Sequence, residues 1–568
     1  MGVCLGNSGR LRFSLVLLGL AGLRAAAGVP VLDQLFPIAL QVGTTNRVEA
    51  VGKVDPWPPK VWVDTPGLTV EATTNQGTLR VIVASDAAIG ARFVRLYNDE
   101  GGSAPHFLLV TAEASEAEVE PNDVYTKAQP VPRLPTVLNG RLEKSGDVDC
   151  YAVTLAAGQT FSAFLEAHTL MSPVDAVLRL VDLRGVEVAA NHDDGRTFDP
   201  RLVWTAAQAG TYVLQVFGFD YPAGSDIRFA GNSKCVYRLY LNTGPYLTHT
   251  LPLGVQRGAN TSLALWAWGA RTNTLPPYVF AGTTLAASAR EIGLTAPGFV
   301  NAIQLPVGDG PELIEQEPNL RPTEAQLLSL PGAVSGVIDP PGDVDRYRFT
   351  AREGEAWVIA VQSAALGFPL DAWLRIEDAA GKELVRVDDS DSADPRLDWT
   401  APAGTNFVAA VGGLGRQGGR NFLYRLSFSR PTPGVKATVA ENVFSVEAGK
   451  TNEIKVTVTR RYQFTNGLSV QVTGLPPGVR AESVPVSEKG GETVLKLIAD
   501  TNAPAASQPL QIGLLDTVTT QVRPVVMELV SAGENNGVPQ GFRHLVRESI
   551  ESLWLSVRPA PKPMPEKK

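Results

Sequence analysis

The segments EVEPND at 118–123 and EQEPNL at 315–320 are two copies of one motif. Three further stretches recur in the same order, namely GDVD at 146–149 and 342–345, DAVLRL at 175–180 with DAWLRI at 371–376, and DPRLVWT at 199–205 with DPRLDWT at 394–400. All four matches are offset by 195–197 residues. So steady an offset indicates two copies of one domain, separated by only small insertions or deletions.

The residues between these motifs alternate in the way that half-buried strands do. Tyr151, Val153 and Leu155 are separated by smaller or polar residues, and the second copy shows the same alternation from Trp357 onward. A period of two places one face of each strand in the core and the other in water. We therefore predict an all-β protein of tandem β-sandwich modules. The stretch Arg543–Leu555 is the best helix candidate.

Composition agrees with a modular, exported β-protein. A chain of 568 residues is too long for one core, and its 54 glycines and 42 prolines suit short strands joined by tight turns. A net charge of −8 without a basic stripe argues against nucleic-acid binding. Arg10 and Arg12 precede a short apolar stretch and then Ala25–Gly28, which predicts a secretory signal peptide over 1–27. No later segment is apolar enough to span a membrane. We expect a secreted, periplasmic or cell-surface protein.

Taken together, these motifs resemble the bacterial pre-peptidase C-terminal (PPC) domains, the family that includes the collagen-binding domains of clostridial collagenases. The resemblance covers 116–243 and 313–430 and implies two jelly-roll-like β-sandwiches. A weaker match, of Phe36-Pro37 with Leu251-Pro252, indicates that a small leading module is repeated as well. The flanking segments resemble Ig-like domains. The predicted organisation is a signal peptide (1–27), an Ig-like N-terminal module (28–115), the first repeat (116–243), an Ig-like middle module (244–312), the second repeat (313–430), an Ig-like C-terminal module (431–558) and a disordered tail (559–568).

The repeated motifs contain many side chains whose oxygen atoms can bind a metal ion. Glu118 and Glu120 share one side of an extended segment, as do Asp147 and Asp149 on a predicted strand. Such hard donors, without a nearby His or Cys, suit Ca²⁺. In the PPC family this stretch and the Asp-x-Asp pair hold calcium, so the resemblance implies a set of six ligands: Glu118, Glu120, Asn122, Asp123, Asp147 and Asp149.

An alternative interpretation is that these residues are turn and capping residues on a solvated face, because Pro-Asn and Gly-Asp are common turn dipeptides. The same explanation serves Asp193-Asp194 and Asp388-Asp389. In the second copy Leu320 replaces Asp123, so calcium is less expected there. The second candidate set is Glu315, Glu317, Asn319, Asp343 and Asp345.

Two cysteines follow the signal peptide, Cys150 and Cys235. In an exported protein they either form a disulfide or remain as two buried thiols, and sequence leaves both options open.

No catalytic constellation is evident. The five histidines are scattered singly, and there is neither a Gly-x-Ser-x-Gly elbow nor a His-Glu-x-x-His motif. We therefore expect a non-catalytic protein that binds an extracellular polymer, envelope protein or polysaccharide. The alternatives are a structural spacer or accessory to a separate secreted enzyme, and a hydrolase that uses the acidic cluster. Exposed aromatic residues would favour binding, and Trp266 and Trp268 either share such a face or lie in a core strand.

Overall fold

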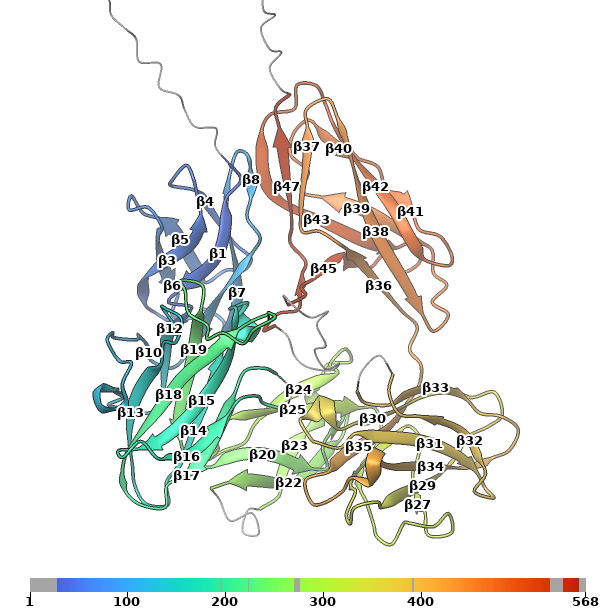
Figure 1. Cartoon of the computed structure of the whole chain (residues 1–568). Coiled ribbons are helices and arrows are strands. Elements are labelled where there is room, and N and C mark those ends of the chain that lie inside the picture. Colours follow the sequence, from blue (N-terminus) through green and yellow to red (C-terminus); the bar gives the residue numbers. More distant parts are fainter. Residues whose placement is uncertain are drawn as a thin grey trace, which may run out of the picture.

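The chain is an all-β protein of tandem β-sandwiches, as predicted (Figure 1). The computed structural model describes residues 28–195, 197–222, 224–269, 276–390, 393–531 and 545–560. The predicted signal peptide and residues 561–568 of the predicted tail lie outside them. Within the described ranges the helices are 3-10 turns of three residues, and none could cross a membrane.

The first repeat is a jelly roll. Its two sheets have the orders β10-β12-β19-β14-β17 and β11-β13-β18-β15-β16. If β12 to β19 are counted as strands 1 to 8, the orders become 1-8-3-6 and 2-7-4-5, the arrangement of two Greek keys folded together. The elements are β10 (Ser115–Ala117), η1 (Tyr125–Lys127), β11 (Gln129–Pro130), β12 (Thr136–Arg141), β13 (Asp149–Leu155), β14 (Thr160–Glu166), η2 (His168–Leu170), β15 (Val174–Asp182), β16 (Glu187–Asn191), β17 (Arg201–Thr205), β18 (Gly210–Asp220) and β19 (Val236–Thr243).

The second repeat has the same topology, strand for strand. Its sheets run β26-β28-β35-β30-β33 and β27-β29-β34-β31-β32. The internal repeat in the sequence is therefore a repeat of fold. The elements are β26 (Glu312–Ile314), β27 (Gln326–Leu327), β28 (Gly332–Val337), β29 (Val344–Thr350), β30 (Ala356–Gln362), η5 (Ala364–Leu366), β31 (Ala372–Asp378), β32 (Glu383–Val387), β33 (Arg396–Thr400), β34 (Asn406–Gly413), η6 (Leu414–Arg416) and β35 (Leu423–Ser429).

The N-terminal module has the strand order of an Ig-like sandwich. The sheets β1-β3-β6-β5 and β2-β9-β7-β4, with β8 beside β7, correspond to the A-B-E-D and A′-G-F-C sheets of that fold. The strands are β1 (Val31–Phe36), β2 (Ala39–Gln41), β3 (Thr45–Lys53), β4 (Lys60–Val63), β5 (Leu68–Ala72), β6 (Thr78–Val83), β7 (Gly90–Asn98), β8 (Gly101–Gly102) and β9 (His106–Thr111).

The middle module is a smaller version of the same sandwich, with three strands in each sheet. Its sheets are β20-β22-β23 and β21-β25-β24. The elements are β20 (Tyr246–Leu251), β21 (Val255–Gln256), β22 (Asn260–Trp268), β23 (Tyr278–Ala281), η4 (Gly282–Thr284), β24 (Glu291–Thr295) and β25 (Ala302–Gly308).

The C-terminal module is the largest Ig-like sandwich of the chain. Its sheets are β40-β42-β38-β36-β45-β46 and β37-β47-β43-β39-β41, with β44 beside β43. The strands are β36 (Gly434–Val439), β37 (Val443–Glu447), β38 (Thr451–Arg461), β39 (Leu468–Thr473), β40 (Val479–Ala481), β41 (Val484–Pro485), β42 (Gly491–Ala499), β43 (Ala506–Asp516), β44 (Val522–Pro524), β45 (Val526–Glu528), β46 (Ser549–Ile550) and β47 (Leu553–Arg558).

The helix predicted over Arg543–Leu555 is wrong for every residue of it that the structure describes. Residues 549–550 and 553–555 lie in β46 and β47, and the rest of 545–555 is irregular. The apolar spacing has another cause: Leu545 and Ile550 pack against Phe93 and Phe107 of the N-terminal module. Burial at a tertiary contact, not a helical face, produced the pattern.

The repeated DPRL motif anchors a turn inside each jelly roll. The buried carboxylate of Asp199 accepts hydrogen bonds from the amides of Ala167, His168 and Thr169 and from the Thr169 hydroxyl, all at or beside η2. Asp394 does the same for the amides at the start of η5. The motif thus supplies acceptors for N–H groups that a short 3-10 turn leaves unpaired.

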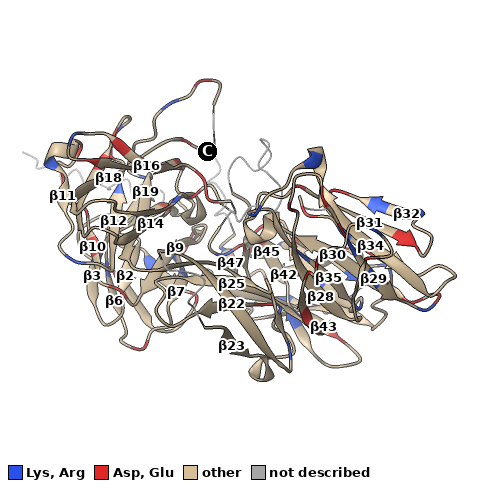
Figure 2. Cartoon of the chain, turned by 90° about the horizontal axis from the view of Figure 1, so that it is seen from below, with Lys and Arg blue, Asp and Glu red and all other residues tan. Residues whose placement is uncertain are grey.

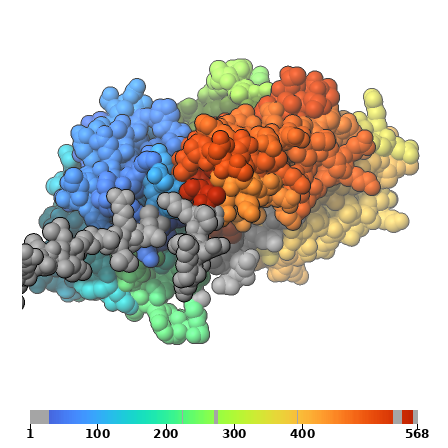
Figure 3. Space-filling model, turned by 90° about the horizontal axis from the view of Figure 1, so that it is seen from above, coloured from blue at the N-terminus to red at the C-terminus, as the bar shows by residue number. Residues whose placement is uncertain are grey.

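The first and last modules touch, so the chain closes on itself (Figures 1 and 3). Trp554 of β47 is 1% exposed, and its ring lies 5.9 Å from Trp62 and 4.9 Å from Tyr97 between ring centroids. At Gly102 a Cβ atom would stand 2.6 Å from the Trp554 indole nitrogen, so this approach needs glycine. The buried Arg95 donates to Asn442 Oδ1 at 2.9 Å across the same junction.

Candidate metal centres and binding surfaces

In the first repeat, the start of the EVEPND segment lies against the beginning of β13. Ligand oxygens of Glu118, Glu120 and Asp149 lie within 4.8 Å of one another. The Arg141 amide holds Glu118 Oε1 at 2.7 Å, and the Tyr237 hydroxyl holds Asp149 Oδ2 at 2.5 Å. These hydrogen bonds fix the carboxylates and leave Asp149 Oδ1 without a hydrogen-bond partner among the described residues.

The other predicted ligands of the first repeat fall into two groups. Asn122 and Asp147 are buried, and Asn122 Oδ1 and Nδ2 and Asp147 Oδ1 have no hydrogen-bond partner in the described part of the chain. Asp123, by contrast, lies at the rim, where its Oδ1 pairs with Lys144 Nζ at 2.8 Å. The same ammonium lies 3.6 Å from Asp147 Oδ1. The Lys144 side chain therefore places a positive charge beside the acidic cluster.

The second repeat also has a cluster of three carboxylates, in which Asp343, and not Glu315, joins Glu317 and Asp345. Ligand oxygens of Glu317, Asp343 and Asp345 lie within 4.8 Å of one another, and Asp345 accepts a hydrogen bond from Tyr424 at 2.6 Å. Asn319 is fully buried, and neither of its side-chain polar atoms has a partner among the described residues. Glu315 accepts from the Val337 amide at 3.0 Å, as Glu118 does from Arg141.

Burial and mutual repulsion raise the pKa of three carboxyl groups in these clusters, those of Glu118, Asp149 and Asp345. Burial, with a smaller contribution from Glu120, raises the pKa of Glu118 to about 8. The pKa of Asp149 is raised well above its ordinary range, first by burial and then by the charge of Glu118. In the second repeat, the same causes raise the pKa of Asp345 to about 9. A cation among these oxygens would relieve both effects.

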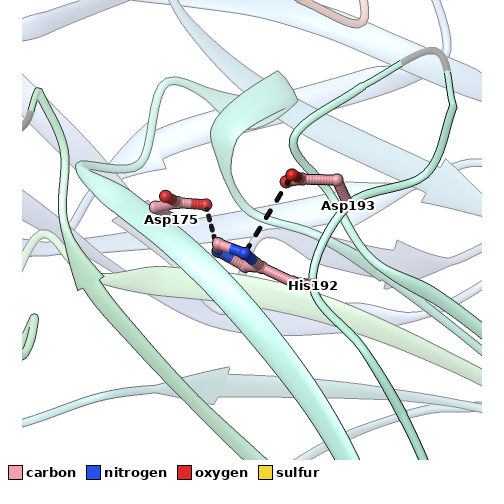
Figure 4. A group of neighbouring side chains, drawn as sticks. All are labelled: Asp175, His192 and Asp193. Carbon is pink, nitrogen blue, oxygen red and sulfur yellow. Dashed lines mark ion pairs between the residues drawn. The ribbon is translucent and has the colours of Figure 1, made fainter.

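A third group, Asp175, His192 and Asp193, includes one residue of the Asp193-Asp194 pair that the sequence assigned to a turn. Asp175 Oδ1 lies 3.0 Å from His192 Nε2, and Asp193 Oδ2 lies 4.0 Å from His192 Nδ1 (Figure 4). The pairing of β15 with β16 brings these residues together, because Leu178 faces Asn191. Each ring nitrogen faces a carboxylate, so the group pairs β15 with the loop after β16 when the imidazole is protonated.

The sequence match paired Asp193-Asp194 with Asp388-Asp389, and the strand register shifts this alignment by one residue. Leu178 faces Asn191 in the first repeat and Leu374 faces Val387 in the second, so Asp388 occupies the position of His192. Asp371, Asp388 and Asp389 therefore replace the Asp-His-Asp group. The unchanged spacing from Asp175 and Asp371 was a signal that sequence reasoning missed.

The middle module presents two tryptophans to solvent. Along β22 the even-numbered residues from 260 to 268 face outward, so that Trp266 is 41% exposed and Trp268 is 52% exposed. The His249 ring stacks on Trp266 at 5.4 Å between ring centroids, with 10° between the ring planes. Of the two interpretations left open by sequence, a core strand is wrong and a shared exposed face is right.

The comparisons with known proteins assign no family. No protein-family model matches the chain. No curated protein matches it either. Among solved structures, a match to tripeptidyl peptidase 2 (TPP II) has 10% sequence identity and a TM-score of 0.15. It covers 93% of this chain and 40% of that one, and similarity this low supports no inference about fold or function.

The structure does not contain the disulfide that the sequence left open. Cys150 and Cys235 are both buried and unbonded. Cys150 packs against Val181 and Val213, whereas Cys235 belongs to the core cluster between the two sheets, as does Tyr151, the neighbour of Cys150. Successive residues of a strand point to opposite faces, so the two thiols lie on opposite sides of the β13 sheet.

Along the ribbon, the positions of Lys and Arg are interspersed with those of Asp and Glu (Figure 2).

One buried histidine predicts a pH dependence of stability. Burial lowers the pKa of His106 to about 4, and its Nδ1 atom has no hydrogen-bond partner among the described residues. The unfolded chain takes up this proton near pH 6.5 and the folded chain only near pH 4, so the contribution of His106 to stability is lost as the pH falls through that window. The loss should approach about 3 kcal/mol at pH 4. In urea titrations at pH 7 and 4.5, His106→Gln should show a smaller drop than the wild type; an equal drop would contradict the assignment.

Proposed function

We propose that the chain is a secreted or periplasmic, non-catalytic protein that binds an extracellular polysaccharide, and that calcium stabilises its two jelly-roll modules. The observation that carries the binding role is the exposure of Trp266 and Trp268 on one sheet face. Large aromatic rings are enriched in binding faces because they bury much apolar area at low entropic cost. Residues two apart on a strand lie about 6.6–6.8 Å apart, so the two indoles suit neighbouring rings of a sugar chain.

Calcium is proposed from the donor set and its unpartnered atoms. Buried polar atoms without a partner are rare in folded proteins, yet each repeat places a buried asparagine and a buried aspartate oxygen of this kind beside clustered carboxylates. All the donors are hard oxygens, which fits Ca²⁺. The ligands proposed for the first repeat are Glu118, Glu120, Asn122, Asp123, Asp147 and Asp149, and those for the second are Glu315, Glu317, Asn319, Asp343 and Asp345.

We further propose that the two repeats are PPC domains. The Glu-x-Glu-Pro-Asn and Asp-Pro-Arg-Leu motifs support this, and so does the jelly-roll strand order. Export is proposed from the signal-like sequence over 1–27.

The binding role is tested with the full-length secreted protein in calcium, by co-sedimentation with insoluble cellulose, chitin, peptidoglycan and collagen. We expect retention on at least one polysaccharide and a loss of about tenfold or more in affinity for Trp266→Ala/Trp268→Ala, as for hot-spot aromatics. Val518→Ala, another exposed apolar residue, is the matched control. No retention on any polysaccharide, retention on collagen alone, or unchanged binding by the double variant would contradict the proposal.

A rigid structural spacer is the second candidate function. Closure of the chain through Trp554 and the buried contacts of Leu545 and Ile550 with the N-terminal module favour it, because they hold the modules in one arrangement. A protein that binds none of the polymers would favour this role.

A further inference from the structure

A cavity of about 830 Å³ lies where three modules and the C-terminal segment meet. Its wall is formed by β7 and β9 of the N-terminal module, by β14, β17 and β19 of the first repeat, by the middle module and by Val546 and Arg547. This volume is within the range of roughly 300–1,000 Å³ that is usual for small-molecule sites. No residue of the two acidic clusters or of the tryptophan face lines it.

One wall of the cavity is an aromatic surface. Phe164 on β14 and Tyr240 on β19 are directly opposed in the sheet, so both rings point to the same side. Tyr246 of the middle module joins them, and the Arg201 guanidinium lies 4.8 Å from the Phe164 ring centroid and 5.8 Å from that of Tyr246. Flat, half-buried rings of this kind suit the faces of sugar rings.

The polar part of the cavity contains four arginines, including Arg547, and two carboxylates, Glu113 and Glu166. Arg92, Arg201 and Arg238 all line it, and each has a buried Nε–H with no acceptor among the described residues. Arg201 and Arg238 have carboxylate partners, Asp194 at 3.2 Å and Glu166 at 2.7 Å.

Arg92 differs from these two, because its terminal nitrogens donate to the backbone carbonyls of Ala88 and Ala91 and, within the described part of the chain, to no carboxylate. Buried donors without acceptors favour a ligand that brings anionic oxygens. The Arg92 guanidinium therefore favours a carboxylate on the ligand, and the aromatic rings favour the faces of sugar rings.

We infer that this cavity is a second binding site, specific for an acidic oligosaccharide whose sugar rings stack on Tyr240 and Phe164 and whose carboxylates pair with Arg92. The site is independent of the tryptophan face. It is built from separate modules, so closure of the chain assembles it.

The test is isothermal titration of the full-length protein in low salt with two matched probes. One is a β-1,4-linked tetrasaccharide of glucuronic acid, and the other is cellotetraose, which has hydroxymethyl groups in place of the carboxylates. We expect the acidic probe to bind at least tenfold more tightly, and its affinity to fall as salt is added. Failure of the acidic probe to bind, or equal binding of the neutral one, would overturn the inference.

Variants assign the binding to this cavity. Tyr240→Ala and Arg92→Gln should each weaken binding about tenfold or more, whereas Tyr240→Phe, which keeps the ring, should stay within about threefold of wild type. Arg80→Gln, an exposed arginine of the N-terminal module outside the cavity, is the control for charge. Trp266→Ala/Trp268→Ala should leave this binding unchanged, which separates the site from the proposed function. Wild-type affinity in both Tyr240→Ala and Arg92→Gln would overturn the assignment.

Discussion

Asp149→Asn is expected to abolish most of the stabilisation that calcium gives to the first repeat. Calcium bound only by the folded state at a hundredfold excess over its dissociation constant contributes about 2.7 kcal/mol, which corresponds to a shift in melting temperature of roughly 10 °C for a domain of this size. The amide of the variant keeps the shape and the Tyr237 hydrogen bond but removes the charge at the unpartnered Oδ1. Differential scanning calorimetry of the full-length protein, in millimolar calcium and in chelator, measures the shift.

The chelated state gives a second readout of the same variant. In the absence of calcium, Asp149→Asn should be at least as stable as wild type, because it removes one of the carboxyl groups whose burial and repulsion are unfavourable. Asp345→Asn should act in the same way on the second repeat, with a smaller calcium response because Leu320 provides no carboxylate. Asp226→Asn, at an exposed surface pair of the first repeat, is the control. A calcium shift in Asp149→Asn equal to that of wild type would contradict the site.

Asp199→Ala is expected to destabilise the first repeat by about 4 kcal/mol. The substitution leaves three backbone N–H groups and the Thr169 hydroxyl without their acceptor, and each buried unsatisfied group costs about 1–3 kcal/mol before relaxation. Burial raises the pKa of Asp199 to about 6, so the carboxylate is ionised at neutral pH and its hydrogen bonds are charge-assisted.

Urea unfolding at pH 7.5, followed by amide exchange at Ala167–Thr169, measures this effect. Asp226→Ala should change stability by less than about 1 kcal/mol, since exposed ion pairs contribute little. A loss below about 1 kcal/mol in Asp199→Ala would show that water or a local rearrangement replaces the carboxylate.

The repeated motifs predicted the fold because each motif determines a local feature of it, such as a turn or the buried face of a strand. The Asp199 carboxylate anchors a turn, and alternation at Tyr151 and Val153 separates the core from the opposite face of the sheet. Each of these features depends on a few neighbouring residues, so the two copies of the domain share short stretches of similar sequence that can be recognised. The candidate calcium ligands were found for the same reason, since Glu118 and Glu120 are close in sequence.

Contacts between distant modules gave no such signal. Trp554 closes the chain against Tyr97 and Gly102, more than 450 residues earlier, and nothing in the local sequence marks that contact. The cavity between modules was missed because its wall combines residues of separate domains. Leu545 and Ile550 misled the secondary-structure prediction for the same reason, because their apolar spacing reflects a contact with another module.

Calorimetric titration of the chelator-treated, full-length protein with calcium shows whether the two acidic clusters bind the ion. We expect saturable binding with at least two sites per chain, loss of one class of site in Asp149→Asn, loss of the other in Asp345→Asn, and no specific heat of binding in the double variant. Binding that is absent in the wild type, or that persists unchanged in the double variant, would show that the acidic clusters are turn residues and not metal centres.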